Sequence, residues 1–224
     1  MKVLKFGGSS VGTAESIQFV KNIVERAGSP TIVVVSALGG VTDQLLALTR
    51  LAAKGDETYV AQLNELVARH HDLINQVIDA DKRPQLLQRV NALLDELRSI
   101  LHGVCLIQDL TPKTSDAIVA YGERISSEIV AQLITGATHY DSRKFIKTEH
   151  KADKHLVDFN ATNVLVKQTF ASFNKGIAVM GGFIAKDVET GITTNLGRGG
   201  SDYTAAILAA ALNAEALEIW TDVD

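Results

Sequence analysis

The sequence has few of the residues from which disulfides and metal sites are built. Cys105 is the single cysteine in 224 residues, so neither an internal disulfide nor a multi-cysteine metal site can form. The histidines show no metal-ligand spacing, and we expect no metal site in the protein. No apolar run reaches the ~18 residues of a membrane span, and no Lys/Arg run stands out against a net charge of −4. These absences argue against membrane and nucleic-acid roles.

The N-terminal residues also lack the pattern of a secretion signal. They enter a strand-like segment directly, with no charged region followed by an apolar one. Together with the scarcity of cysteine, this predicts a cytoplasmic protein. The composition, 46% hydrophobic and 21% charged, is ordinary for a globular chain and excludes a disordered one. The length suffices for one domain with a real core, and we expect a single domain over residues 1–224.

The hydrophobic pattern alternates strands with helices. It predicts strands at 3–6, 31–35, 138–141, 145–149, 177–181 and 216–220, and a β-hairpin formed by 183–186 and 193–196. It predicts helices at 14–27, 42–53, 114–135, 160–173 and 200–213. Residues 57–102 contain no convincing strand and predict an inserted helical hairpin, 58–80 and 84–102. The expected fold is therefore α/β, with an open, mostly parallel sheet sandwiched by helices.

A pair of glycines follows the first strand. Gly7 and Gly8 let backbone N–H groups approach an anion, and Lys5 places a positive charge nearby. The spacing fits neither G-x-x-x-x-G-K-[ST] nor G-x-G-x-x-G. A tight strand-to-helix turn with a surface lysine explains the same residues equally well.

A second glycine-rich segment, 197–202, opens a helix. Its Arg198 could hold a carboxylate with two hydrogen bonds. The alternative is a capped turn with Ser201 or Asp202 as N-cap. Two anion-ready loops, one with a lysine and one with an arginine, favour two negatively charged ligands that meet. Phosphoryl transfer fits this arrangement, because its catalysis is mostly positioning and charge neutralisation.

Two further features have more than one interpretation. Glu123, taken alone, is typical of a solvated helix face or an ion pair. The polar pair Thr221-Asp222 follows the last strand and could touch a nucleotide or simply begin a turn.

Several segments together resemble the aspartate kinases. They are KFGGSSV at 5–11, VSA at 35–37, GE at 122–123, GGFI at 181–184, LGRGGSDY at 196–203 and IWTDV at 219–223. The resemblance covers essentially the whole chain. It implies the amino-acid-kinase fold and MgATP-dependent phosphorylation of the side-chain carboxylate of L-aspartate. That reaction gives 4-phospho-L-aspartate, the first step of lysine, threonine and methionine synthesis. The resemblance further implies ATP with Mg²⁺, and a homo-oligomer in the full-length protein.

The same resemblance implies roles for individual residues. Lys5 would neutralise the transferring phosphoryl group, and Asp202 would hold this lysine in place. Arg198 would pair with the α-carboxylate of aspartate, and Glu123 with its α-ammonium. The remaining pocket residues would be Ser36, Thr42 and Ser201. The remaining nucleotide-binding residues would be Gly7, Gly8, Ser9, Thr221 and Asp222.

The family pattern continues beyond the last strand with residues that complete the nucleotide site, followed by regulatory ACT domains. We therefore expect residues 1–224 to be a kinase domain truncated at its C-terminal end, with weak or no activity. The insert favours a bifunctional aspartate kinase–homoserine dehydrogenase as the parent. Two alternatives stay open: a carbamate, acetylglutamate or uridylate kinase, and a non-catalytic amino-acid-binding fragment. Arg198 and Glu123 suit a zwitterionic amino acid and so disfavour those other kinases.

Overall fold

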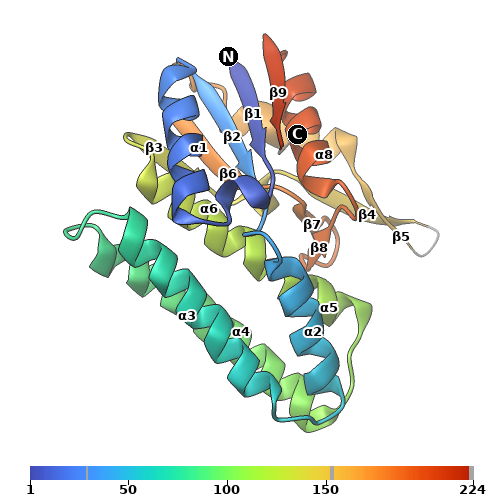
Figure 1. Ribbon diagram of the computed structural model, residues 1–224. Helices are drawn as coiled ribbons and strands as arrows, with labels where there is room; N and C mark the ends of the chain where they lie inside the picture. Colours follow the sequence, from blue (N-terminus) through green and yellow to red (C-terminus); the bar gives the residue numbers. More distant parts are fainter. Residues whose placement is uncertain (29, 152–153, 222–224) are drawn as a thin grey trace.

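A five-stranded parallel sheet forms the centre of the molecule. The computed structural model describes residues 1–28, 30–151 and 154–221. The sheet has the order β3-β6-β2-β1-β9, and its neighbouring strands are all parallel. Its strands are β1 (Lys2–Phe6), β2 (Thr31–Val35), β3 (Ala137–Tyr140), β6 (Ile177–Gly181) and β9 (Ala216–Trp220). The open, mostly parallel α/β sheet predicted from the sequence is confirmed (Figure 1).

Helices cover both faces of this sheet, because its central strands are apolar on both. All five residues of β2 are buried, and they alternate between two core clusters. On one face, Val33 and Val35 join the cluster that includes α1 (Ala14–Arg26) and α6 (Tyr121–Leu133). On the other face, Ile32 and Val34 join the cluster that includes α7 (Phe159–Thr169) and α8 (Gly200–Ala211). A parallel strand buried on both faces reads as the continuous β-branched run seen here.

A second, mixed sheet was not predicted as such. It has the order β5-β4-β7-β8, with β4 (Lys147–Lys151), β5 (Lys154–Val157), β7 (Ile184–Asp187) and β8 (Thr193–Asn195). The expected hairpin is confirmed as the antiparallel pair β7–β8. The strand predicted at 145–149 lies at β4 instead, and β5 was missed. Both strands are short and largely polar, so they lack the apolar pattern that marks a strand in a sequence.

The inserted helical hairpin is confirmed, and it projects below the sheet in Figure 1. It consists of α3 (Tyr59–Val77) and α4 (Arg83–Ile107), which pack beside α2 (Val41–Ala53). The helix predicted at 114–135 is instead divided at Ala120 into α5 (Pro112–Val119) and α6. The two parts have different partners, since α5 packs on α2 and β8 while α6 packs on the sheet. Short 3₁₀ turns at Ser9–Val11 and Ser142–Lys144 complete the described structure. Within the described residues, no helix combines the length and the apolar character needed to cross a membrane.

His70 of α3 is a buried titratable group in the hairpin. Its Nδ1 donates a hydrogen bond to the Leu66 carbonyl (2.8 Å), and burial lowers its pKa to about 4. The unfolded chain, with a histidine pKa near 6.5, therefore takes up this proton first as the pH falls. We expect the free energy of unfolding to fall between pH 7 and pH 4.5, with about 2 kcal/mol of the loss due to this residue.

Denaturant unfolding of the wild type and His70→Leu at both pH values measures this contribution. The exposed His102, replaced in the same way, serves as the control. Equal pH dependence in the wild type and His70→Leu would show that His70 is not held neutral by burial.

Candidate active site

One edge of the parallel sheet brings together the loops that the sequence singled out. Phe6, Val35 and Gly181 are paired across β1, β2 and β6, so these strands end side by side. The loops that follow them border a cavity of about 360 Å³, and α8 begins on its wall. Most of the predicted site residues line this cavity: Lys5, Gly8, Ser36, Thr42, Glu123, Arg198, Ser201 and Asp202.

An ion pair joins β1 to α8 at the cavity. The Nζ atom of Lys5 lies 2.8 Å from Oδ1 of Asp202, and the lysine side chain is only 11% exposed. Asp202 is in the first turn of α8, where a carboxylate is favoured by the helix dipole. The arrangement holds one ammonium group at a fixed place in the cavity wall.

Glu123 is the buried carboxyl of the site. Its Oε1 accepts the Ala37 N–H (3.0 Å), and Oε2 has no hydrogen-bond partner in the described structure. Desolvation raises its pKa to about 7, although the hydrogen bond from Ala37 acts in the opposite direction. A buried carboxyl with an unused oxygen is costly unless a cation or a donor reaches it. The cavity therefore contains a place that favours a positively charged ligand group.

The loop at 36–40 connects the other parts of the site. The Ser36 hydroxyl donates to the Ser201 hydroxyl of α8 (3.0 Å), while the Ser36 carbonyl accepts from Ser126 of α6 (2.7 Å). The Gly39 N–H donates to the Gly8 carbonyl (2.9 Å), so this loop also contacts the one after β1. The loop thus fixes the spacing between α6, α8 and the first glycine loop.

Arg198 is exposed and carries the positive charge on the other wall of the cavity. It lies between Gly197 and Gly199, whose φ angles are +73° and +72°. Only glycine adopts such angles without strain, which explains the glycines that flank this arginine. The guanidinium can receive a carboxylate, and Lys5 and Arg198 together make the cavity suited to two anionic groups.

Some predicted residues lie elsewhere. The Gly7 N–H, predicted to donate to a phosphate, donates instead to the Trp220 carbonyl (3.3 Å) and so continues the β1–β9 pairing. Gly8 is thus the glycine of the pair that borders the site. Ser9 and Thr221 line a separate, mostly apolar cavity with Phe6 and Trp220. Asp222 lies outside the described residues.

Other parts of the site were not predicted. The Ala37 N–H that holds Glu123 is a backbone group, which no residue type identifies. Asp43 also lines the cavity, and its position directly after Thr42 was the available signal. Phe183 lines it with an unusual φ of +65°, and the two glycines before it marked a tight turn there.

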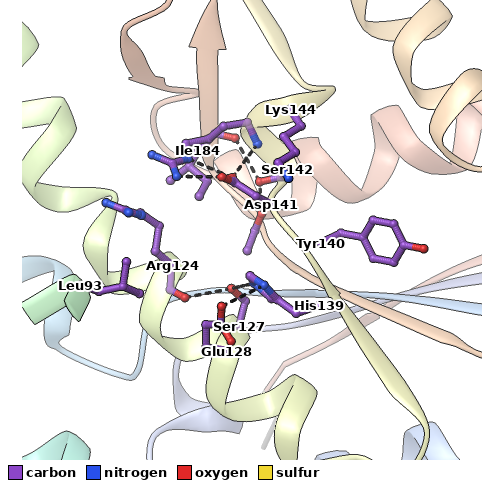
Figure 2. Close-up of a pocket in the computed structure, with 12 residues that line it drawn as sticks. Leu93, Arg124, Ser127, Glu128, His139, Tyr140, Asp141, Ser142, Lys144 and Ile184 are labelled. Carbon is purple, nitrogen blue, oxygen red and sulfur yellow. Dashed lines mark hydrogen bonds and ion pairs between the residues drawn. The ribbon is translucent and has the colours of Figure 1, made fainter. Parts of the chain in front are cut away.

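A neighbouring cavity of about 280 Å³ contains a serine–histidine–carboxylate row (Figure 2). Oγ of Ser127 lies 2.9 Å from Nε2 of His139, whose Nδ1 lies 3.2 Å from Oε1 of Glu128. Ser127 is only 1% exposed and also bonds the Arg124 carbonyl, and Glu128 is tied to Arg89 of α4. The row therefore links α4, α6 and β3 rather than presenting a nucleophile. Within the described ranges, no three His, Cys, Asp or Glu side chains are placed to hold a metal ion.

The arrangement of the sheet and its cavity has counterparts among known proteins. The model of the amino acid kinase family matches residues 1–224. The chain belongs to the amino acid kinase family. It is 31% identical to lysine-sensitive aspartokinase 3 of Escherichia coli (strain K12), over 99% of this chain and 49% of that protein. It is also 31% identical to bifunctional aspartokinase/homoserine dehydrogenase 1, chloroplastic, of Arabidopsis thaliana, over 99% of this chain and 25% of that protein.

A solved structure extends the comparison to three dimensions. The crystal structure of E. coli aspartokinase III in complex with aspartate and ADP superposes with a TM-score of 0.89 and 30% identity. The match covers 100% of this chain and 49% of that one. The chain therefore spans between a quarter and half of the length of the curated relatives described here.

The two glycines after β1 differ sharply in the space around them. A Cβ atom at Gly8 would lie 2.9 Å from the Ala37 carbonyl oxygen, whereas one at Gly7 would meet nothing closer than Lys5 Nζ at 3.6 Å. We expect Gly8→Ala to lower the free energy of unfolding by about 1–3 kcal/mol, because backbone must move to admit the methyl group. Gly7→Ala should change it by less than about 0.5 kcal/mol.

Urea unfolding of both variants beside the wild type checks this difference. Equal stability of the two variants would mean that the loops after β1 and β2 are not packed backbone against backbone.

Proposed function

We propose that the cavity binds L-aspartate and that the protein phosphorylates its side-chain carboxylate, as an aspartate kinase does. The observation that carries this proposal is the charge pattern of one cavity: the buried Glu123 carboxyl, the exposed Arg198 guanidinium and the Lys5 ammonium. The likeness to E. coli aspartokinase III, solved with aspartate and ADP, supports the same substrates here.

In this proposal the amino acid is held as a zwitterion. Glu123 binds the α-ammonium through the oxygen that lacks a protein partner, and Arg198 binds the α-carboxylate. Ser36, Thr42 and Ser201 line the same cavity and supply hydroxyl groups to the ligand. The side-chain carboxylate then remains free to face Lys5.

The transfer step joins this carboxylate to the nucleotide. A carboxylate oxygen forms a bond to the γ-phosphorus of ATP while the bond from that phosphorus to the β,γ-bridging oxygen breaks, giving 4-phospho-L-aspartate and ADP. Lys5, held by Asp202, neutralises charge on the moving phosphoryl group. Mg²⁺ enters as part of the MgATP substrate. Gly7, Gly8, Ser9, Thr221 and Asp222 belong to the proposed nucleotide side, where Ser9 and Thr221 share a cavity with Trp220.

On this basis residues 1–224 form the aspartate-binding part of an aspartate kinase catalytic domain in the synthesis of lysine, threonine and methionine. The competing acceptors of the family differ in their charged groups. Carbamate and uridylate lack an α-ammonium beside an α-carboxylate, and in N-acetylglutamate the amine is acylated. None of these acceptors would use both Glu123 and Arg198 in the proposed way.

Calorimetric titration with L-aspartate tests the proposal on this chain directly. We expect saturable binding, with N-acetyl-L-aspartate, carbamate, N-acetyl-L-glutamate and UMP failing to compete. Arg198→Ala should weaken binding by roughly ten- to a hundred-fold, the value of about 1.5–3 kcal/mol for hydrogen bonds to charged groups. Arg50→Ala, on the exposed side of α2, is the matched control and should bind as the wild type does.

Absence of L-aspartate binding by a chain that unfolds cooperatively would contradict the proposal. Equal binding by the wild type and Arg198→Ala would remove the arginine from the site.

The raised pKa of Glu123 gives a second test. Near pH 7 this carboxyl is partly protonated in the free protein, and an ammonium group beside Oε2 would lower its pKa. We therefore expect a proton to be released on binding, so that affinity rises more than about tenfold between pH 5 and pH 7. Calorimetry at pH 6.5 in buffers of different ionisation enthalpy measures this release.

Glu123→Gln should abolish the proton release and weaken binding. Release that persists in Glu123→Gln would assign the proton to another group.

A further inference from the structure

Asn195, at the end of β8, makes two hydrogen bonds with opposite ends of one amide group. Its Nδ2 donates to Oδ1 of Asp116 on α5 (2.6 Å), and its Oδ1 accepts the Gly197 N–H (3.1 Å). Asn195 does not line the site cavity, but it lies three residues before Arg198, which does. One side chain therefore connects a helix outside the site to the loop that carries the arginine.

The loop after Asn195 needs such a connection because little else constrains it. Residues 197–199 are exposed, and both glycines have positive φ angles. The turn closes on itself through the Gly200 N–H, which donates to the Gly197 carbonyl (2.9 Å). Its far end is fixed by the first turn of α8, while its near end is fixed by Asn195. Glycine-rich segments lose much conformational entropy on ordering, so a tether at the near end determines how well Arg198 is placed.

Asp116 is a suitable anchor for the tether. It lies half-buried on α5, which runs beside β8 (Figure 1) and packs against α2. Burial raises its pKa, and the bond from Asn195 acts in the opposite direction. The same strand is also held two residues earlier, where Arg143 donates to the Thr193 hydroxyl (3.1 Å). The anchor is thus part of the rigid framework and not of the loop.

We propose that Asn195 is a positioning residue for Arg198: by bridging Asp116 and the Gly197 N–H, it holds the arginine loop in the conformation that receives the carboxylate of the substrate. This inference rests on the proposed function, in which Arg198 binds the α-carboxylate of L-aspartate. The substitutions that test it exploit the opposite polarity of the two ends of the amide.

Asn195→Asp keeps the acceptor for the Gly197 N–H but places a carboxylate against Asp116. We expect L-aspartate binding about tenfold weaker than in the wild type. Asp116→Asn alone leaves a donor and an acceptor facing each other, and its loss should be smaller. The double variant Asn195→Asp/Asp116→Asn reverses the polarity of the bond and retains the Gly197 contact. Its binding should return to within about threefold of the wild type, a rescue that loss of general stability does not produce.

Amide hydrogen exchange reports on the loop without any ligand. In Asn195→Ala the Gly197 N–H loses its acceptor, and we expect its exchange to be about tenfold faster, with the core strand β2 unchanged. Unchanged exchange at Gly197 would overturn the inference, as would a double variant that binds no better than Asn195→Asp. If the wild type fails to bind L-aspartate while Gly197 exchange responds as expected, the tether stands and the proposed function fails.

Discussion

The site depends on the close approach of backbone segments at the carboxyl edge of the parallel sheet. The glycines at this edge leave no room for a methyl group. A Cβ atom at Gly182 would lie 2.7 Å from Cα of Ser201, and one at Gly181 would lie 2.9 Å from Cβ of Glu123. Because β6 can press against both α6 and α8 only in this way, Glu123 and Ser201 reach the same cavity. The chemistry of the site follows from a packing constraint that is paid in conformational freedom.

The charges of the site are arranged unequally. Lys5 and Asp202 neutralise each other, whereas Glu123 is buried with one oxygen unused and Arg198 is exposed on a flexible loop. The unliganded protein therefore carries the cost of a desolvated carboxyl, which a ligand ammonium would relieve. The asymmetry explains why a zwitterion suits the cavity better than a simple anion does. Asn195 and Asp116 add the order that the arginine side lacks.

The sequence predicted the features that depend on apolar runs and on glycine, and missed those that depend on backbone geometry. The apolar run at 31–35 marked the central strand, and the segments around Gly8 and Arg198 marked the site. The second sheet was hidden because β4 and β5 carry few apolar residues. The division of the predicted helix at Ala120 follows from different packing partners, which no local pattern records. Likewise, nothing in the sequence shows that the Gly7 N–H is used by Trp220 while the Ala37 N–H holds Glu123.

The most direct test of the central claim locates the amino acid on the protein. Backbone amide resonances of the ¹⁵N-labelled chain would be followed during titration with L-aspartate. The account predicts saturable shifts at Ala37, Arg198 and Ser201, which surround the charged groups of one cavity. Shifts confined to other surfaces, such as the cavity around His139, or no saturable shift in a folded chain, would contradict it.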